Sequence, residues 1–413
     1  MVNYKKYDNG LRLIVNTMDA MMSVSAGILV GAGSCLEDEN NNGISHFIEH
    51  TTFKGTEKMS AFEISSAFDD IGSQVNAFTS KETTCYYVKS TTAELEMSFE
   101  LLSDIFLNST YKADELNKEK GVVIEEINMC ADTPEELCLD ALSESYFGKQ
   151  GLGRTILGPA ENVNSFTKKH ITAFRKRFYN ADNIIVSFAG RISFDEAMKL
   201  TERYFAPFVS SSKSDALLSG ETENKQSKIR IDKDIEQIHL ALAFKGVEYD
   251  APLADAMSVV NNVAGSGMSS RLFQKIREEL GLCYTIYSYP SCYLKTGTFA
   301  VYAGLNPRSA ELAYEEIKRV LTEIKKNGIT DDEFNRGKAQ MISSFAFGQE
   351  STASQMLLYG KYLLNTGKVF DAEKKLAAVG ALDKNAVNEL LDELDFSAYS
   401  VAVVGKNATK VEV

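Results

Sequence analysis

An internal repeat limits this chain to two copies of one structural unit. The segment DELN (114–117) aligns with DEFN (332–335), and AEL (93–95) aligns with AEL (310–312) at nearly the same offset in residue number. In both places an alternating segment typical of a strand precedes an amphipathic helix, and a second helix follows. We therefore predict that the 413 residues form two homologous halves of similar size.

Each half opens with segments in which apolar and polar residues alternate. They are LRLIVN (11–16) and SVSAGILVGAG (23–33) in the first half, and KIRID (228–232) and IHLALAFKGV (238–247) in the second. Alternation predicts antiparallel sheets with one covered face, on which the helices pack. The polar, aperiodic segment 208–228 is typical of a linker. The predicted fold class is α+β, with a first domain at 1–210, a linker at 211–228 and a homologous second domain at 229–413.

Composition narrows the function classes. The net charge is −13 without a basic cluster, which argues against nucleic-acid binding; the acidic surface favours solubility, with basic partners as the alternative. No stretch of 18 uncharged apolar residues occurs, so we expect no membrane span. Without an export signal, the six cysteines are expected to be reduced. The absence of an Arg-rich leader favours a bacterial cytoplasmic protein, with a mature organellar protein as the alternative.

Two of the four histidines lie four residues apart in GISHFIEHTTFKG (43–55). Polar residues precede this segment and Gly55 is a plausible stop for a short helix, on which His46 and His50 are neighbours at i and i+4. Two imidazoles so placed can bind one metal ion, and Glu49 lies close enough to reach a metal-bound water. The spacing is H-x-x-E-H, the inverse of H-E-x-x-H. The alternative is a pair of surface histidines on a polar helix.

A catalytic zinc needs a third protein ligand, and the candidate is Glu126. On a helix predicted for 114–131, the positions that share one stripe are Glu119, Val122, Val123, Glu126 and Cys130. A carboxylate on an apolar stripe is costly unless it is paired or binds a metal. Glu125 points about 100° away and is expected to face solvent. Without the histidines, a salt-bridged surface carboxylate would be the default interpretation of Glu126.

The repeat supplies an internal control for this constellation. At the offset that aligns DELN with DEFN, Glu126 aligns with Ser344 and Glu119 aligns with Gly337. The segment AGSGMSSRLF (264–273) occupies the region where a second H-x-x-E-H would fall. The sequence therefore predicts a metal site in the first half and none in its copy.

The sequence resembles the pitrilysin-like zinc peptidases, or inverzincins. Within them it is most similar to the short-chain branch that includes the β-subunit of the mitochondrial processing peptidase and bacterial processing-protease-like proteins. The likeness covers nearly the whole chain and is densest at GISHFIEHTTFKGT (43–56), IGSQVNAFTSKETTCYY (71–87), EKGVVIEEI (119–127), LGRTILGP (152–159) and SRLFQKIREELGLCYTIYS (270–288).

The resemblance implies a role for each residue of the constellation. The spacing that the family keeps between its second histidine and its third ligand leads from His50 to Glu126, and the supporting glutamate seven positions earlier is Glu119. By this likeness His46, His50 and Glu126 bind one Zn²⁺ per chain, and Glu49 is the general base. Zinc is an expectation from ligand type, since imidazole also suits other metals.

The resemblance also implies a substrate site. Segment 75–80 matches the family's edge strand, where Asn76 and Ala77 would bind a peptide added as an extra strand. Arg277 and Tyr284 have the spacing of the family's C-terminal Arg/Tyr pair, which reaches the substrate and the tetrahedral intermediate. On the residues alone, Asn76 and Ala77 are ordinary strand positions, Arg277 is a solvated helix charge and Tyr284 is a core aromatic.

The expected activity is zinc-dependent endopeptidase action on unfolded peptides, which two halves closing like a clamshell would admit while excluding folded proteins. The alternative is a non-catalytic or partner-dependent assembly subunit of the same family. We expect a homodimer, with a monomer or a heterodimer with a related chain as alternatives. Nothing in the sequence identifies the physiological substrate.

Overall fold

The computed structural model describes residues 1–205 and 224–413, so most of the predicted linker at 211–228 lies outside the described residues. The chain divides into two compact units. The first unit comprises Met1–Ile127, the described part of Thr155–Leu218, and Ala346–Phe370. The second unit comprises Asn128–Arg154, the described part of Ser219–Phe345, and Asp371–Val413. The predicted domains follow the sequence repeats, whereas each unit contains a segment from the opposite repeat.

The first unit is built on a six-stranded sheet. Its strands are β1 (Val2–Lys6), β2 (Arg12–Thr17), β3 (Ser23–Val30), β4 (Gln74–Thr79), β5 (Thr84–Thr91) and β6 (Ile184–Gly190), in the order β1-β2-β6-β3-β5-β4. All neighbours are antiparallel except β2 and β6, which run parallel. Strand β4 therefore lies at one edge of this sheet, paired on one side only with β5.

The second unit repeats this topology. Its strands are β7 (Lys228–Asp232), β8 (Ile238–Lys245), β9 (Cys283–Tyr293), β10 (Thr296–Leu305) and β11 (Tyr399–Gly405), in the order β7-β11-β8-β10-β9. The pair β7 and β11 is parallel and the other pairs are antiparallel, which matches β2-β6-β3-β5-β4 strand for strand. The shared order confirms the predicted α+β fold of two homologous halves, with one parallel pair added to each expected antiparallel sheet.

Helices follow the same correspondence. In the first half they are α1 (Ile44–Thr52), α2 (Ala61–Asp70), α3 (Leu95–Asn108), α4 (Ala113–Asp132), α5 (Pro134–Phe147), α6 (Ala160–Ser165), α7 (Lys168–Phe178) and α8 (Phe194–Phe205). In the second half they are α9 (Ala254–Ala264), a π-helical turn η4 (Phe273–Glu279), α10 (Ala310–Asn327), α11 (Asp331–Gln349), α12 (Thr352–Thr366), α13 (Ala372–Ala381) and α14 (Lys384–Glu393). The starts of α4 and α11, and those of α5 and α12, are separated by the offset that aligns DELN with DEFN.

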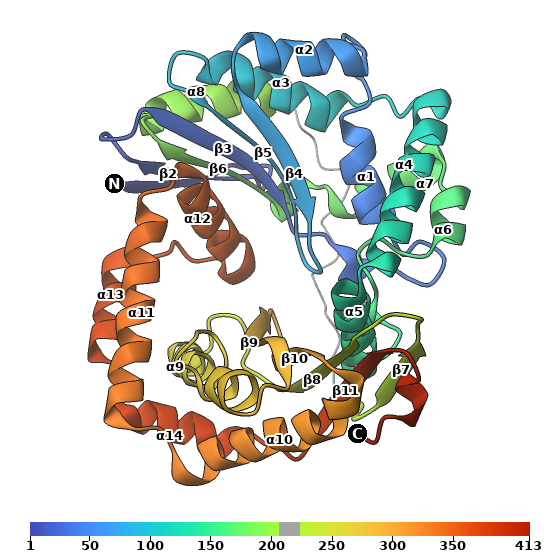
Figure 1. Ribbon diagram of the computed structural model, residues 1–413. Coiled ribbons are helices and arrows are strands. Elements are labelled where there is room, and N and C mark those ends of the chain that lie inside the picture. The colour runs from blue at the N-terminus through green and yellow to red at the C-terminus, as the bar shows by residue number, and fades with distance from the viewer. Residues whose placement is uncertain (206–223) are drawn as a thin grey trace. The chain divides into compact units, whose positions relative to one another are not determined.

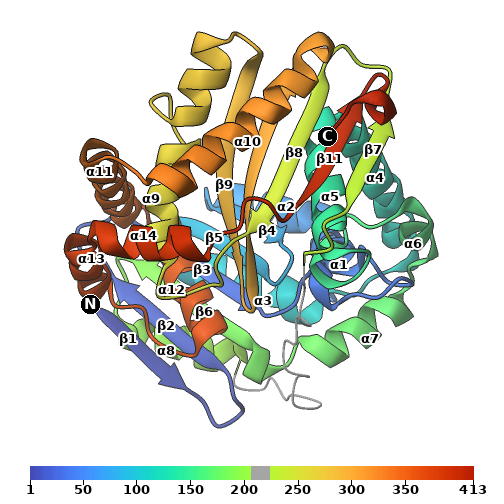
Figure 2. The same cartoon turned by 90° about the horizontal axis from the view of Figure 1, so that it is seen from below.

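Helices α5 and α12 are exchanged between the repeats. Helix α5 belongs to the second unit, where it contacts β11 and β8, and α12 belongs to the first unit, where it contacts β3 and β6. Figure 1 shows α12 against the first sheet on the face opposite α3 and α8, and Figure 2 shows α10 running across the strands of the second sheet. The expectation of one covered face is therefore wrong for the centre of each sheet, because the exchanged helix covers the other face.

Small residues make the contact between α12 and the first sheet close. Met356 is fully buried, and a Cβ added to Gly27 would lie 2.3 Å from its sulfur. Ser187 Oγ donates to the carbonyl of Met356 at 2.8 Å, and Asn16 Nδ2 donates to Gln355 Oε1 at 3.1 Å. These bonds satisfy polar groups that the docking buries. Among the described residues, none of the helices combines the length and apolar character needed to cross a bilayer.

Candidate metal centre

The buried carboxylate of Glu37 accepts hydrogen bonds at the N-terminus of α1, a role that was not predicted from the sequence. Glu37 is 5% exposed, and its Oε2 accepts from the backbone N–H of Gly43 at 2.7 Å and from Asn42 Nδ2 at 2.8 Å. Its Oε1 accepts from the backbone N–H of Ser45 at 2.8 Å. A negative charge that binds the free N–H groups of a helix N-terminus stabilises the helix. Burial raises the pKa of Glu37, and these hydrogen bonds partly offset the rise.

Backbone geometry fixes the same helix start. Gly43 has a φ of +99°, a left-handed conformation that favours glycine, and an added Cβ would lie 2.4 Å from the carbonyl oxygen of Leu157. The side chain of Asn42 also donates to the carbonyl of Thr155 at 2.8 Å. These contacts tie the start of α1 to the segment LGRTILGP, whose role could not be inferred from its residues alone.

The structure brings His46, His50 and Glu126 together. Their potential ligand atoms all lie within 4.8 Å of one another. Glu126 Oε2 lies 3.3 Å from His50 Nε2 and 3.7 Å from His46 Nε2. Two ligands on a tetrahedral zinc with bonds of about 2.0–2.1 Å are separated by about 3.3 Å. Two imidazole nitrogens and one carboxylate at these separations fit a zinc site of the catalytic type, which keeps a position for water.

Glu119 orients one of these imidazoles. Its Oε1 lies 2.9 Å from His50 Nδ1, and its Oε2 accepts from Lys54 Nζ at 2.7 Å. Glu119 is 4% exposed, and although burial raises its pKa, the bonds from His50 and Lys54 outweigh burial and lower it. A proton held on Nδ1 leaves Nε2 free to bind a metal, which is the usual carboxylate–histidine–metal arrangement. Lys54 was absent from the predicted site.

The pKa values of the two histidines shift in opposite directions, because the carboxylates around His50 outweigh its burial. Burial, with a smaller contribution from the neighbouring His50, lowers the pKa of His46 to about 3, so this imidazole is neutral at pH 7. Burial also opposes the charge on His50, but the hydrogen bond that it donates to Glu119 and the charges of the nearby carboxylates outweigh burial and raise its pKa. Metal ligation requires the neutral imidazole, which His46 already supplies.

Glu49 lies on α1 with His46 and His50, and its carboxylate is near His50 and Glu126. Its Oε2 accepts a hydrogen bond of 2.5 Å from Thr79 Oγ1 on β4. Burial raises the pKa of Glu49, and the Thr79 bond and the charge of His50 reduce the rise. Among the described residues, Oε1 has no hydrogen-bond partner. Thr79 lies in the segment NAFTS that the sequence analysis singled out, but its bond to Glu49 could not be read from the sequence.

The stripe predicted for α4 is partly wrong. Glu119 and Val123 are buried as expected, and Glu125 is exposed as expected. Val122, however, is 51% exposed, because the buried face of α4 is narrower than the stripe assigned from helical spacing. Glu126 lies at the margin of this face with 32% of its side chain exposed, where a carboxylate can meet both a metal and water.

Asn76 and Ala77 lie on the edge strand β4, where exposed and partly buried positions alternate. The N–H of Ala77 donates to the side-chain Oδ1 of the preceding Asn76 at 2.8 Å. An added peptide strand would have to replace this local bond. Asn76 is exposed, so its side chain can rotate away without losing buried contacts.

Arg277 and Tyr284 lie together in the second unit. The guanidinium carbon of Arg277 lies 4.7 Å from the ring centroid of Tyr284 and 4.6 Å from that of Phe273. Phe273 was absent from the predicted site. The register of β9 and β10 shifts at Leu305, so Tyr284 is an unpaired bulge residue. A bulge re-aims a side chain, and Tyr284 is 75% exposed rather than buried in the core.

Comparisons with known proteins identify the family of this chain. The family described as insulinase, peptidase family M16, matches residues 13–160, and the peptidase M16 inactive domain matches residues 165–341. The uncharacterized zinc protease YmxG of Bacillus subtilis is 39% identical over 402 residues, which cover 97% of this chain and 98% of that protein. An uncharacterized zinc protease of Rickettsia felis is 33% identical over 406 residues, which cover 98% of each protein.

Two solved structures share the fold. A protease from Helicobacter pylori has a TM-score of 0.89 at 23% identity, with 98% of this chain and 100% of that chain covered. A structure described as a peptidase M16 inactive domain from Pseudomonas fluorescens has a TM-score of 0.92 at 20% identity, with 98% of each chain covered. His46, His50 and Glu126 all lie in the part of this chain that matches the insulinase family rather than the inactive domain.

Proposed function

Because the chain belongs to peptidase family M16, the pitrilysin-like family, we propose that it is a zinc-dependent endopeptidase that cleaves unfolded peptides. The observation that carries this proposal is the convergence of His46, His50 and Glu126 beside the partly buried carboxylate of Glu49. One zinc ion per chain, held by these three side chains, would supply the Lewis acidity that activates water and polarises a scissile carbonyl.

Glu49 has the environment of a general base. Its Oε2 is occupied by Thr79, so the proton taken from the attacking water would be held at Oε1 and returned to the leaving amine. A carboxylate whose pKa is raised by burial accepts and releases a proton more readily near neutral pH than an exposed one. Thr79 fixes the direction of the carboxylate, which favours a single geometry for this transfer.

Other residues would hold the substrate and the site. Glu119, anchored by Lys54, keeps the His50 ring in one orientation. A peptide added to the free edge of β4 at Asn76 and Ala77 would lie beside the strand that carries Thr79. Arg277 and Tyr284, whose stacked geometry exposes a phenol hydroxyl and a cation, are proposed to bind the substrate and stabilise the oxyanion.

Several finer points stay predictions. They are the likeness to the processing peptidase β-subunit, a clamshell that closes over the substrate, a homodimeric or monomeric state, and a bacterial cytoplasmic location. The non-catalytic or partner-dependent assembly subunit is an outcome that the following experiment can reveal.

The test is hydrolysis of an internally quenched, unstructured peptide by the wild type and by Glu49→Gln, with Glu125→Gln as the matched control. Glu125 is an exposed carboxylate next to Glu126. We expect the wild type and Glu125→Gln to cleave at similar rates and Glu49→Gln to lose at least a hundredfold in kcat. Equal rates for Glu49→Gln and the wild type would refute the assigned role. No cleavage by the zinc-loaded wild type across several peptides would support the assembly-subunit alternative.

A further inference from the structure

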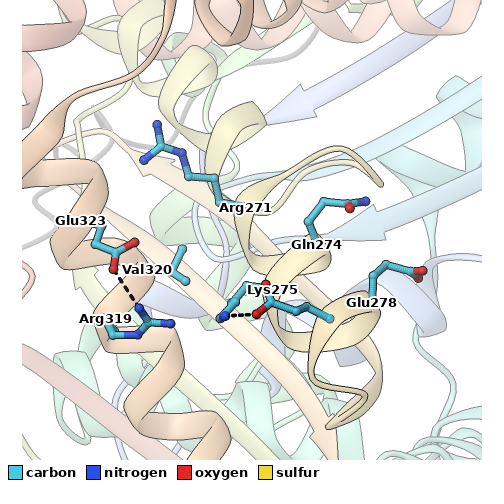
Figure 3. A pocket seen from close by; sticks show the side chains of 8 residues that line it. Arg271, Gln274, Lys275, Glu278, Arg319, Val320 and Glu323 are labelled. Carbon is cyan, nitrogen blue, oxygen red and sulfur yellow. Dashed lines mark hydrogen bonds and ion pairs between the residues drawn. The ribbon is translucent and has the colours of Figure 1, made fainter.

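Two cavities lined by described residues of the second unit differ in whether their cationic side chains are already paired with carboxylates. The first, of about 570 Å³, lies between the turn η4 and α10, and its lining is shown in Figure 3. Each cation in it is held by a carboxylate of this chain: Lys275 by Glu279, Arg319 by Glu323, and Arg271 by Glu333. A cavity whose charges already neutralise one another has little to offer a charged ligand.

The second cavity, of about 790 Å³, occupies the place in its repeat that the metal centre occupies in the first. Gly337 and Ser344 both line it, and they align with Glu119 and Glu126. Its walls come from α9, the segment 266–269, Pro290 of β9, α11 and α13. Replacement of two carboxylates by a glycine and a serine leaves an open space where the first half has the potential zinc ligand Glu126 and the carboxylate of Glu119 that orients His50.

The side chains of this cavity include polar groups with no internal partner. Among the described residues, Asn262 on α9 and Arg336 and Gln340 on α11 make no side-chain hydrogen bond or ion pair. Lys375, by contrast, is held by Asp255 at 2.5 Å. The cavity therefore presents two free amides and one free guanidinium, beside an apolar surface formed by Met341 and Val379.

We propose that this cavity binds an acidic segment of the peptide substrate, an inference that rests on the proposed function. Amide side chains match the donors and acceptors of a peptide backbone, and the Arg336 guanidinium matches an Asp or Glu carboxylate. The aligned position in the first repeat, around Glu119 and Glu126, is where the proposed function places peptide cleavage. The second repeat retains the space for a peptide without the groups for hydrolysis.

Recognition in this cavity occurs through side chains rather than by strand addition to β9. The N–H of Ser288 on β9 already donates to the carbonyl of Gly265 at 3.2 Å. Two residues further along β9, Pro290 lines the cavity and has no N–H to offer. A bound segment would therefore contact α9 and α11, which distinguishes this site from the free edge of β4.

The test measures binding without hydrolysis, so it does not depend on catalysis. A labelled, unstructured peptide with a Glu-containing segment, and the same peptide with Gln in place of Glu, are titrated against Glu49→Gln by fluorescence anisotropy. In this background, Ser344→Trp fills the cavity, whereas Ser343→Trp adds the same side chain at an exposed neighbour outside it. We expect Ser344→Trp to weaken binding of the acidic peptide at least fivefold and Ser343→Trp to leave it unchanged.

A charge variant provides the second arm. Arg336→Gln is expected to weaken binding of the acidic peptide about threefold and to leave the Gln peptide unaffected, as the loss of one exposed ion pair predicts. Arg308→Gln, at an exposed arginine that does not line the cavity, is the control. Equal affinities of Ser344→Trp and Ser343→Trp, or equal losses for both peptides in Arg336→Gln, would overturn the proposal. If binding behaves as expected while the wild type cleaves no peptide, the proposed hydrolysis fails and the cavity's role stands.

Discussion

The carboxylate of Glu37 should be one of the most important single side chains for the stability of the first unit. Replacement by alanine removes the acceptor of three donors: the N–H groups of Gly43 and Ser45 and the amide of Asn42, at 2.7–2.8 Å. A buried donor left without a partner costs about 1–3 kcal/mol. Some of this cost is offset because the desolvation of the charge is also removed, and we expect Glu37→Ala to lower the free energy of unfolding by about 4 kcal/mol.

Glu37→Gln should have a smaller effect. Glutamine keeps one oxygen at nearly the same place but turns an amide N–H₂ toward at least one donor at the start of α1, and it removes the charge at the helix N-terminus. The expected loss is about 2 kcal/mol. Glu39→Gln changes a nearby exposed carboxylate and should stay within about 0.5 kcal/mol of the wild type.

Urea unfolding followed by circular dichroism gives the comparison, with the slope of the transition checked for constancy. The same variants, measured in a zinc competition assay, should lose zinc affinity in the same order, because α1 carries two of the three potential ligands. A loss below about 1 kcal/mol for Glu37→Ala at unchanged slope would refute the argument that Glu37 anchors this helix.

Three further predictions concern other parts of the chain. Glu119→Gln should weaken zinc binding about 10- to 100-fold, because the bond that orients His50 is impaired; unchanged affinity in a chelator competition would contradict this. The Arg271 bond outweighs burial and lowers the pKa of Glu333 from 4.5 to about 2, so its stabilisation is complete above pH 4.5 and is lost as the pH falls toward 2. Between pH 6 and pH 3 the wild type should therefore lose about 1–2 kcal/mol more unfolding free energy than Glu333→Gln, and equal losses would count against the pair. Met356→Ala should cost about 3 kcal/mol in urea unfolding, and a cost under about 1 kcal/mol would mean that α12 contributes little to the first unit.

The sequence was sufficient for those features that depend on local spacing or on the repeat. The constant offset between matching segments predicts two homologous halves, and the starts of α4 and α11 carry the same offset in the structure. The i, i+4 spacing of His46 and His50 predicts neighbouring imidazoles, whose ring centroids lie 4.5 Å apart. Glu126 is indicated by its place on a predicted helix and by the family resemblance, and the fold brings it to both histidines.

Features that depend on long-range packing could not be predicted. The exchange of α5 and α12 leaves no local signal, because an apolar helix face does not specify which sheet it covers. The sequence does show that strands such as β6, IIVSFAG, are almost continuously apolar, which is typical of a strand buried on both faces. Glu37 was overlooked because its donors belong to a turn whose geometry depends on residues near Leu157. Phe273 was overlooked because a π-helical turn changes which side chains lie together.

The most direct test of the account is the zinc content of the purified protein, measured by elemental mass spectrometry after dialysis against metal-free buffer. The wild type and Glu125→Gln should each retain about one zinc per chain, and Glu126→Gln should retain almost none. A wild type without zinc after reconstitution, or a Glu126→Gln variant that retains as much zinc as Glu125→Gln, would contradict the assignment of His46, His50 and Glu126 as the metal centre.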